Sequence, residues 1–160
     1  MDPVTLDRLA IASTRLRVAG LREGDLSRPT VNAGWDVRAL VAHLVGGCLL
    51  YAGVLRGGTV EWATRDTRPV TDPLGQFDAA AAIAIHATDM LVHGWDLAVA
   101  TGQDRGLDPD LCAAATAIIS RFPASTWGNP KYYAQRVPTD STGPADRLVA
   151  LTGRDPNAGR

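Results

Sequence analysis

The sequence has little of what marks secreted, membrane-bound or nucleic-acid-binding proteins. It contains only two cysteines, Cys48 and Cys112. Both lie in apolar helical patterns, so we interpret them as buried, reduced thiols. No apolar run approaches the roughly 20 residues that cross a bilayer, and the acidic, polar N-terminus is unlike a secretory signal. The formal net charge is −1, without the basic stripe that neutralises nucleic-acid phosphates. These absences predict a cytoplasmic protein that binds neither membranes nor nucleic acids.

The length and composition indicate one folded domain. The chain has 160 residues, of which 46% are hydrophobic, and this is enough for a single core. We therefore treat residues 1–160 as a single domain. There is no internal repeat and no alternating strand pattern, whereas apolar residues recur at helical spacing. The expected fold is all-α, with helices over residues 4–20, 35–56, 77–100, 109–121 and 144–151 and loops over 25–34 and 59–76.

Several expected helix ends carry residues with known capping preferences. Asp108 and Pro109 suit the cap and the first turn of the fourth helix, and Gly153 suits the C-terminal stop of the last one. Beyond it, the tail 154–160 is expected to fray. In the first helix, apolar residues three and four apart predict the face that packs on the core: Leu6, Leu9, Ala12, Leu16 and Ala19.

The sequence has only three histidines, and two of them share a helix face with a carboxylate. His86, Asp89 and His93 are spaced i, i+3, i+7, which places them within a sector of about 60° on one helix. Asp89 and His93, four residues apart, can present a carboxylate oxygen and an imidazole nitrogen to one ion. The spacing is therefore compatible with a metal site.

The remaining histidine, His43, lies on the otherwise apolar face of the second helix. It is expected to point into the bundle, where Gly46 and Gly47, one turn later, leave room beside it. Together with Asp89 and His93, it would supply two imidazoles and one carboxylate. Three protein ligands leave a coordination position open, as in catalytic zinc sites. The same donors also suit a non-haem iron site.

Each of these positions also has a structural interpretation. A histidine on an apolar face, such as His43, is more often a hydrogen-bonded core residue than a ligand. Asp89 and His93 could form an ion pair on a solvated face. His86 could be a further ligand, a group behind the ligands or a surface residue, and we favour a position outside the inner ligand set.

Two more residues of the third helix bear on the site. Asp96, three residues after His93, could orient an imidazole N–H from behind the ligands, or could be a polar surface or capping residue. Trp95 lies roughly opposite the Asp89 and His93 face, which favours packing between helices over stacking on a substrate. No residue stands out as a general acid or base, so catalytic groups beyond the metal ligands remain unknown.

Four segments resemble a known family. Residues 35–44 (WDVRALVAHL) resemble the second-helix signature of the DinB-like and mycothiol-dependent maleylpyruvate isomerase superfamily. Residues 86–102 (HATDMLVHGWDLAVATG) and 144–156 (PADRLVALTGRDP) are similar to an actinobacterial metal-binding branch of it, as is the short segment 26–30 (LSRPT). The resemblance implies a DinB-like antiparallel four-helix bundle that binds a divalent metal, with zinc expected. It implies His43 and His93 as ligands and places Asp89 where the isomerase has a glutamate.

The sequence also departs from that family. The isomerase has an additional C-terminal α/β domain, for which no residues remain here. The family bundle has a further helix between the histidine helix and the Asp/His helix, whereas residues 57–76 are too short and too rich in proline and glycine to form it. A bundle that lacks one wall exposes apolar surface, which predicts a homodimer.

The resemblance implies a metal-dependent, thiol-assisted function. The expected activity is that of a transferase or isomerase that uses mycothiol or a similar thiol as cosubstrate and acts on a small electrophile. The alternative is a non-catalytic metal-binding or dimerisation module, which the missing domain and the missing helix favour.

Overall fold

The computed structural model describes residues 1–55, 79–121 and 134–158. In these residues the regular elements are helices, apart from one isolated bridge between Pro29 and Asp36. The all-α prediction is confirmed. The predicted loop over 59–76, and the helix expected to be missing there, lie outside the described residues. The elements in chain order are α1 (Pro3–Ala19), the 3-10 turn η1 (Glu23–Asp25), α2 (Val37–Leu55), α3 (Ala79–Thr101), α4 (Pro109–Ile119) and α6 (Pro144–Leu151).

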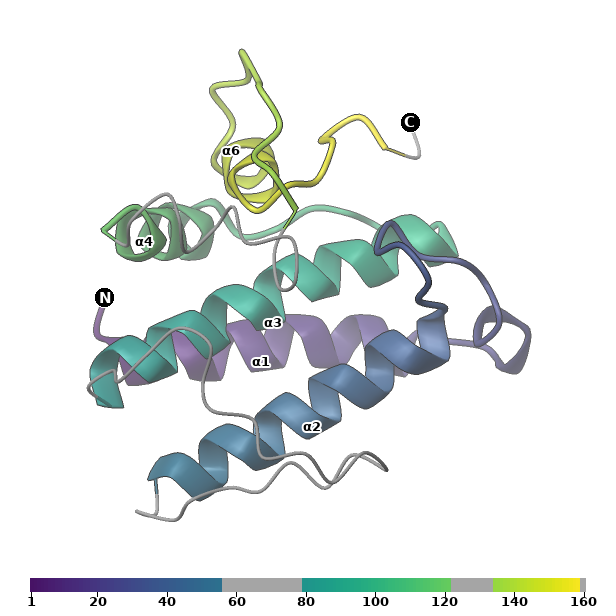
Figure 1. Ribbon diagram of the computed structural model, residues 1–160, viewed down its shortest axis with the longest axis horizontal. Coiled ribbons are helices and arrows are strands. Elements are labelled where there is room, and N and C mark those ends of the chain that lie inside the picture. The colour runs from purple at the N-terminus through teal and green to yellow at the C-terminus, as the bar shows by residue number, and fades with distance from the viewer. Residues whose placement is uncertain (56–78, 122–133, 159–160) are drawn as a thin grey trace.

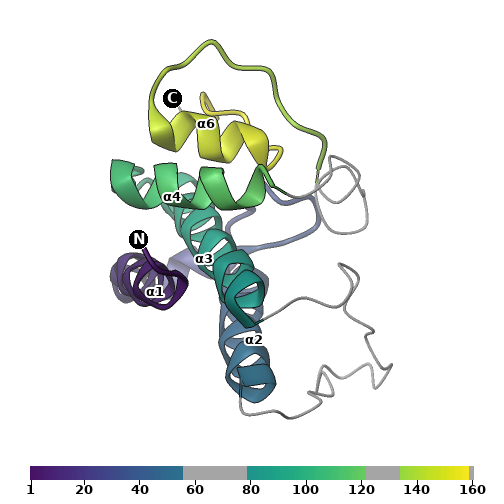
Figure 2. The same cartoon turned by 90° about the vertical axis from the view of Figure 1, so that its left-hand side faces the viewer.

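Helix α3 is the centre of the arrangement (Figure 1). Helices α1 and α2 run along it, while α4 packs across it and carries α6 on its outer side, as Figure 2 shows. Among the described elements, α2 makes its main contacts with α3. Helix α3 therefore contacts other helices on several of its sides.

The middle of α3 is almost completely buried. Every residue from Ala84 to Ala98 is buried except Asp89, whose side chain is 24% exposed. A helix that is apolar nearly all round is expected at the centre of a fold. The buried stretch nevertheless contains four polar residues: His86, Thr88, His93 and Asp96.

The predicted buried face of α1 is wrong. Of the five predicted residues only Leu6 is buried, whereas Leu9 and Leu16 are 45% and 74% exposed. Thr14 and Arg17 are buried in place of these leucines, because both polar side chains find hydrogen-bond partners in the interior. The face that packs on the core consists of Leu6, Ala10, Thr14 and Arg17.

Hydrogen bonds explain why α1 turns its polar residues inward. The Thr14 hydroxyl donates to the Met90 carbonyl on α3 at 2.6 Å. The Arg17 guanidinium donates to the Ser13 carbonyl at 3.0 Å and to the Gly106 carbonyl. Burial lowers the pKa of Arg17, against the effect of nearby Asp104. Helix α1 is thus held on α3 by the Thr14 hydrogen bond as well as by apolar contact, and on the segment after α3 by Arg17.

The predicted helix ends agree with the structure within a few residues. The Asp108 carboxylate accepts hydrogen bonds from the backbone N–H groups of Asp110 and Leu111, and Pro109 opens α4. Gly153 follows α6 with a φ of +86°, a conformation that favours glycine. Helix α2 begins at Val37 rather than at Trp35, because the Asp36 carboxylate caps it by accepting from the Ala39 N–H.

The tail after α6 is not frayed where the structure describes it. Arg154 is half-buried and Pro156 is buried, and Arg105 donates a 2.6 Å hydrogen bond to the Ala158 carbonyl. The fraying predicted for 154–160 is therefore wrong as far as residue 158. A segment without an apolar pattern is held here by polar contacts.

Other expectations about the core are met in part. Trp95 is 3% exposed within the main hydrophobic cluster, as its position on the helix predicted. Cys48 and Cys112 are both free, but only Cys112 is buried as predicted, whereas Cys48 is half-buried. Burial raises the pKa of the Cys112 thiol to about 12. Of the described helices, none combines the length and the hydropathy needed to cross a bilayer.

Candidate metal centre

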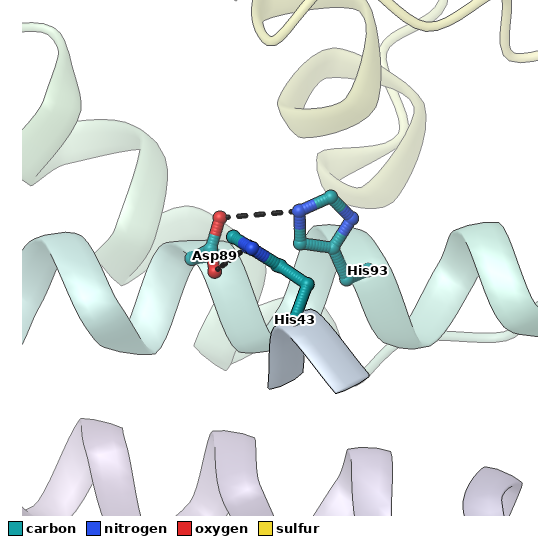
Figure 3. A group of neighbouring side chains, drawn as sticks. All are labelled: His43, Asp89 and His93. Atoms are coloured by element: carbon teal, nitrogen blue, oxygen red, sulfur yellow. Dashed lines mark hydrogen bonds and ion pairs between the residues drawn. The ribbon is translucent and has the colours of Figure 1, made fainter. Parts of the chain in front are cut away.

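Three side chains predicted to be metal ligands meet between α2 and α3 (Figure 3). The Asp89 carboxylate lies between two imidazoles, with Oδ2 3.2 Å from His43 Nε2 and Oδ1 3.3 Å from His93 Nε2. One donor atom from each residue lies within 4.8 Å of the others. The structure therefore brings together His43, Asp89 and His93, which are 46 and 4 residues apart in the sequence.

The packing of α2 on α3 explains why His43 reaches this point. Leu40 and Leu44, three residues before His43 and one after it, are 0% and 4% exposed. These leucines hold this part of α2 against the core, so His43 is carried to the edge of the α2–α3 contact. On α3, Asp89 and His93 are one turn apart and lie on the same face. Asp89 thus reaches both rings although it is one methylene shorter than glutamate.

The charges at the cluster favour an ionised carboxylate. Burial alone would raise the pKa of Asp89, but neighbouring His93 and His43 hold it well below its usual value. Burial alone would lower the pKa of His93, but Asp89 and Asp96 raise it to about 9. In the metal-free protein the His93 ring is therefore protonated at neutral pH and donates to a carboxylate from each nitrogen.

The donor set fits a divalent ion. In a tetrahedral site with bonds of about 2.0–2.1 Å, neighbouring donor atoms lie about 3.3–3.4 Å apart. Each ring nitrogen lies close to this distance from a different oxygen of Asp89, at 3.2 and 3.3 Å, and one donor atom from each of the three residues lies within 4.8 Å of the others. An ion would take the place of the protons that now lie between the carboxylate and the imidazoles. His43, Asp89 and His93 could hold such an ion through two nitrogens and a carboxylate oxygen.

A cavity of about 790 Å³ opens over the cluster. Trp35 forms part of its wall, with its ring centroid 5.0 Å from that of His43 and 6.2 Å from that of His93. Trp35 was not among the residues predicted for the site, although it lies in the motif that contains His43. The cavity is also lined by apolar side chains, which include Val31, Ile85 and Val92, and by polar residues of two loops, which include Asn32, Thr152, Arg154 and Asp155.

Asp96 lies behind His93, which agrees with the orienting role that was one of its two interpretations. Its Oδ2 atom is 2.8 Å from His93 Nδ1, the ring nitrogen that faces away from Asp89. Asp96 is fully buried. Burial alone would raise the pKa of Asp96, but His93 and Arg154 hold it below its usual value.

His86 is not brought to the cluster. Its Nδ1 atom lies 2.7 Å from Asp7 Oδ1 on α1, and its ring packs on Tyr51 with centroids 4.5 Å apart. Gly47, expected to leave room beside His43, faces His86 instead: a Cβ there would lie 3.8 Å from the His86 ring. Within the described part of the chain, His86 therefore belongs to the contact among α1, α2 and α3.

Comparison with known proteins gives a partial family match. Residues 8–71 match the family described as the mycothiol maleylpyruvate isomerase N-terminal domain. The chain is also 29% identical to two uncharacterized proteins of Mycobacterium tuberculosis, from strains H37Rv and CDC 1551, in alignments that cover 96% of this chain and 98% of each relative. The family match includes α2 with His43 and ends before α3. No solved structure matches the chain.

Proposed function

We propose that this chain, whose residues 8–71 match the mycothiol maleylpyruvate isomerase N-terminal domain family, is a metal-dependent enzyme that uses a small thiol. The reaction would be a thiol-assisted transfer or isomerisation of a small electrophile, with mycothiol or a similar thiol as cosubstrate. The observation that carries the proposal is the convergence of His43, Asp89 and His93 beside a cavity.

The three residues at the cluster would hold the ion and leave a coordination position open. A bound divalent ion, with zinc expected, favours the thiolate form of a coordinated thiol and so supplies a nucleophile at neutral pH. Asp89 would contribute the negative charge of the ligand set. Asp96 would hold the proton on His93 Nδ1, which leaves the Nε2 lone pair for the ion.

The cavity supports a small-molecule substrate. Its volume of about 790 Å³ lies in the range of about 300–1,000 Å³ found for small-molecule sites. Trp35 and the apolar residues of the wall would exclude water from one side of the reacting groups. The polar residues of the two loops would contact the more soluble parts of the substrate and the thiol.

Elemental analysis of the purified protein and of histidine variants tests the metal. We expect about one zinc per chain in the parent and none in His43→Ala or His93→Ala. His86→Gln is the matched control, because His86 lies outside the cluster, and it should retain the metal. Iron in place of zinc would support the non-haem iron alternative. A parent protein without stoichiometric metal after reconstitution would overturn the proposal.

Consumption of a thiol tests the chemistry. The metal-loaded protein, incubated with mycothiol and a panel of small electrophiles that includes maleylpyruvate, should accelerate loss of free thiol or isomerisation of the electrophile. His43→Ala and His93→Ala should reduce the rate to the uncatalysed level. A protein that holds metal but accelerates none of these reactions would be the non-catalytic module instead.

A further inference from the structure

We propose that Arg154 and Asn32 are positioning residues of the metal centre, which act through Asp96 on His93; the inference rests on the proposed metal-binding function. Their side-chain hydrogen bonds go to Asp96, to each other and to the Thr152 carbonyl. Arg154 comes from the segment after α6, and Asn32 from the loop before α2. Both converge on the one carboxylate that lies behind His93.

Asp96 is a fully buried carboxylate that needs several donors. Its Oδ2 atom accepts from His93 Nδ1 at 2.8 Å, from Asn32 Nδ2 at 2.9 Å and from Arg154 Nη2 at 2.9 Å. The Arg154 Nε group donates to Oδ1 at 3.3 Å. A carboxylate left in the interior without such partners would strongly disfavour the folded state. These donors therefore stabilise the ionised form of Asp96 in the interior.

Arg154 and Asn32 also hold each other. Arg154 Nη2 donates to Asn32 Oδ1 at 2.9 Å, and Arg154 Nη1 donates to the Thr152 carbonyl at 2.7 Å. The three side chains of Asn32, Asp96 and Arg154 thus form a closed triangle of hydrogen bonds. A planar guanidinium with several donors in a fixed fork suits this arrangement, whereas an ammonium group could not reproduce it.

The triangle determines which nitrogen of His93 can bind an ion. An ionised carboxylate only accepts hydrogen bonds, so His93 Nδ1 must carry a proton to donate to Asp96. In a neutral ring, the free lone pair is then on Nε2, which faces Asp89 at 3.3 Å. The geometry also fixes the rotation of the ring. Removal of the group that accepts the second N–H of a ligating histidine, as Asp96 does here, commonly weakens metal binding about 10- to 100-fold.

Metal affinity and a tail-anchoring control test the inference. Zinc dissociation constants would be measured by competition with a chromogenic chelator. We expect Arg154→Ala and Asn32→Ala to weaken zinc binding by about 10- to 100-fold, and Arg154→Lys to restore only part of it. Arg105→Ala is the control, because Arg105 anchors the same segment through the Ala158 carbonyl and does not contact Asp96. It should leave zinc affinity unchanged.

A double-mutant cycle tests whether the effect passes through Asp96. In an Asp96→Asn background, Arg154→Ala should cause much less further loss of zinc affinity than it does in the parent. Additive losses would overturn the inference, as would equal losses in Arg154→Ala and Arg105→Ala. Circular dichroism of each variant would establish that it is folded before titration.

NMR of the metal-free protein separates this inference from the proposed function. The His93 Nδ1 proton should be visible in a ¹⁵N-histidine spectrum, shifted downfield by its bond to Asp96. The signal should move or disappear in Arg154→Ala and remain in Arg105→Ala. If the parent binds no zinc but these spectra behave as expected, the proposed function fails while the positioning of His93 stands. An unchanged Nδ1 signal in Arg154→Ala would overturn the positioning role.

Discussion

Gly94 of α3 lies against Thr14 of α1 so closely that a Cβ atom on Gly94 would be 2.6 Å from the Thr14 hydroxyl oxygen. That hydroxyl donates to the Met90 carbonyl, one turn earlier on α3. The absence of a side chain at position 94 therefore allows α1 to approach the central helix and make this bond. The same stretch of α3 carries Asp89 and His93, so the contact also supports the candidate metal centre.

Gly94→Ala should destabilise the protein. Alanine gains about 1 kcal/mol of helix propensity over glycine, but overpacking typically costs about 1–3 kcal/mol and the Thr14 hydrogen bond would also be disturbed. We expect a net loss of about 1 kcal/mol in the free energy of unfolding, measured by urea denaturation. Gly24→Ala, with no atom within 4 Å of its Cβ position, should be close to neutral. Thr14→Ala should recover part of the loss in Gly94→Ala, and a double variant with purely additive losses would contradict this explanation.

Asp89→Asn should abolish metal binding with little change in shape. The amide keeps the size of the carboxylate but removes the negative charge that faces His43 and His93. We expect zinc affinity to fall at least about 100-fold, measured by chelator competition. Asp155→Asn is the control, since Asp155 lines the same cavity and is exposed. Comparable losses in both variants would show that general cavity charge, rather than ligation, governs binding.

The metal-free protein should become less stable as the pH rises above neutrality. The pKa of His93 is raised to about 9 in the folded protein, against about 6.5 in an unfolded chain. A group with a raised folded pKa stabilises the fold fully below its unfolded pKa, and that contribution is lost as the pH rises through the folded value. The free energy of unfolding should therefore fall between about pH 6.5 and 9, by at most about 1.4 kcal/mol per pH unit.

Urea denaturation of the chelator-treated protein at several pH values would measure this decline. Asp89→Asn removes one of the two carboxylates that raise the His93 pKa, so its stability should fall less over the same range. A parent protein whose stability is constant or rises between pH 6.5 and 9 would contradict the assignment.

The predicted homodimer can be tested at leucines that are exposed on two helices. Leu16 on α1 is 74% exposed, and Leu49 on α2 is 68% exposed; exposed apolar patches commonly mark association surfaces. Light scattering at micromolar concentration should give the mass of a dimer. Leu16→Glu or Leu49→Glu should shift it toward the monomer, whereas Ala117→Glu at an exposed position on α4 should not. A monomeric parent would rule out the dimer.

The helices and the cluster could be predicted because their signals are local. The helical periodicity, the Asp108 cap and the Gly153 stop are short-range patterns, and Asp89 and His93 are one turn apart. The apolar face around His43 predicted that its ring points into the bundle, but its pairing with Asp89 and His93 was specified by the resemblance to a known family, since no spacing rule connects it to a residue 46 positions away.

His86 shows where the helical wheel misleads. The wheel places it in the same sector as Asp89 and His93, but seven residues of helix put it about 10 Å from His93 along the axis. Its partner, Asp7, comes from another helix. The wheel gives direction around the axis and omits distance along it.

Hydrogen bonds between polar residues that are far apart in the chain could not be predicted from the sequence. The buried face of α1 was misjudged because Thr14 and Arg17 find partners on segments far away in sequence, and the leucines that fit the apolar pattern are exposed. The roles of Asn32 and Arg154 had no local signal: Arg154 lies 58 positions from Asp96 and 122 from Asn32. Only the folded arrangement brings such groups together.

Because α3 is buried, substitutions in this helix and substitutions in the cavity wall differ in how easily the protein can accept them during evolution. Replacements in α3 between positions 84 and 98 alter the interior almost everywhere, so that helix is poorly suited to gradual adaptation. The cavity wall, in contrast, includes Val31 and Asp155, whose side chains are exposed. Relatives could therefore diverge in what they recognise by varying these exposed wall positions while inheriting the same central helix unchanged.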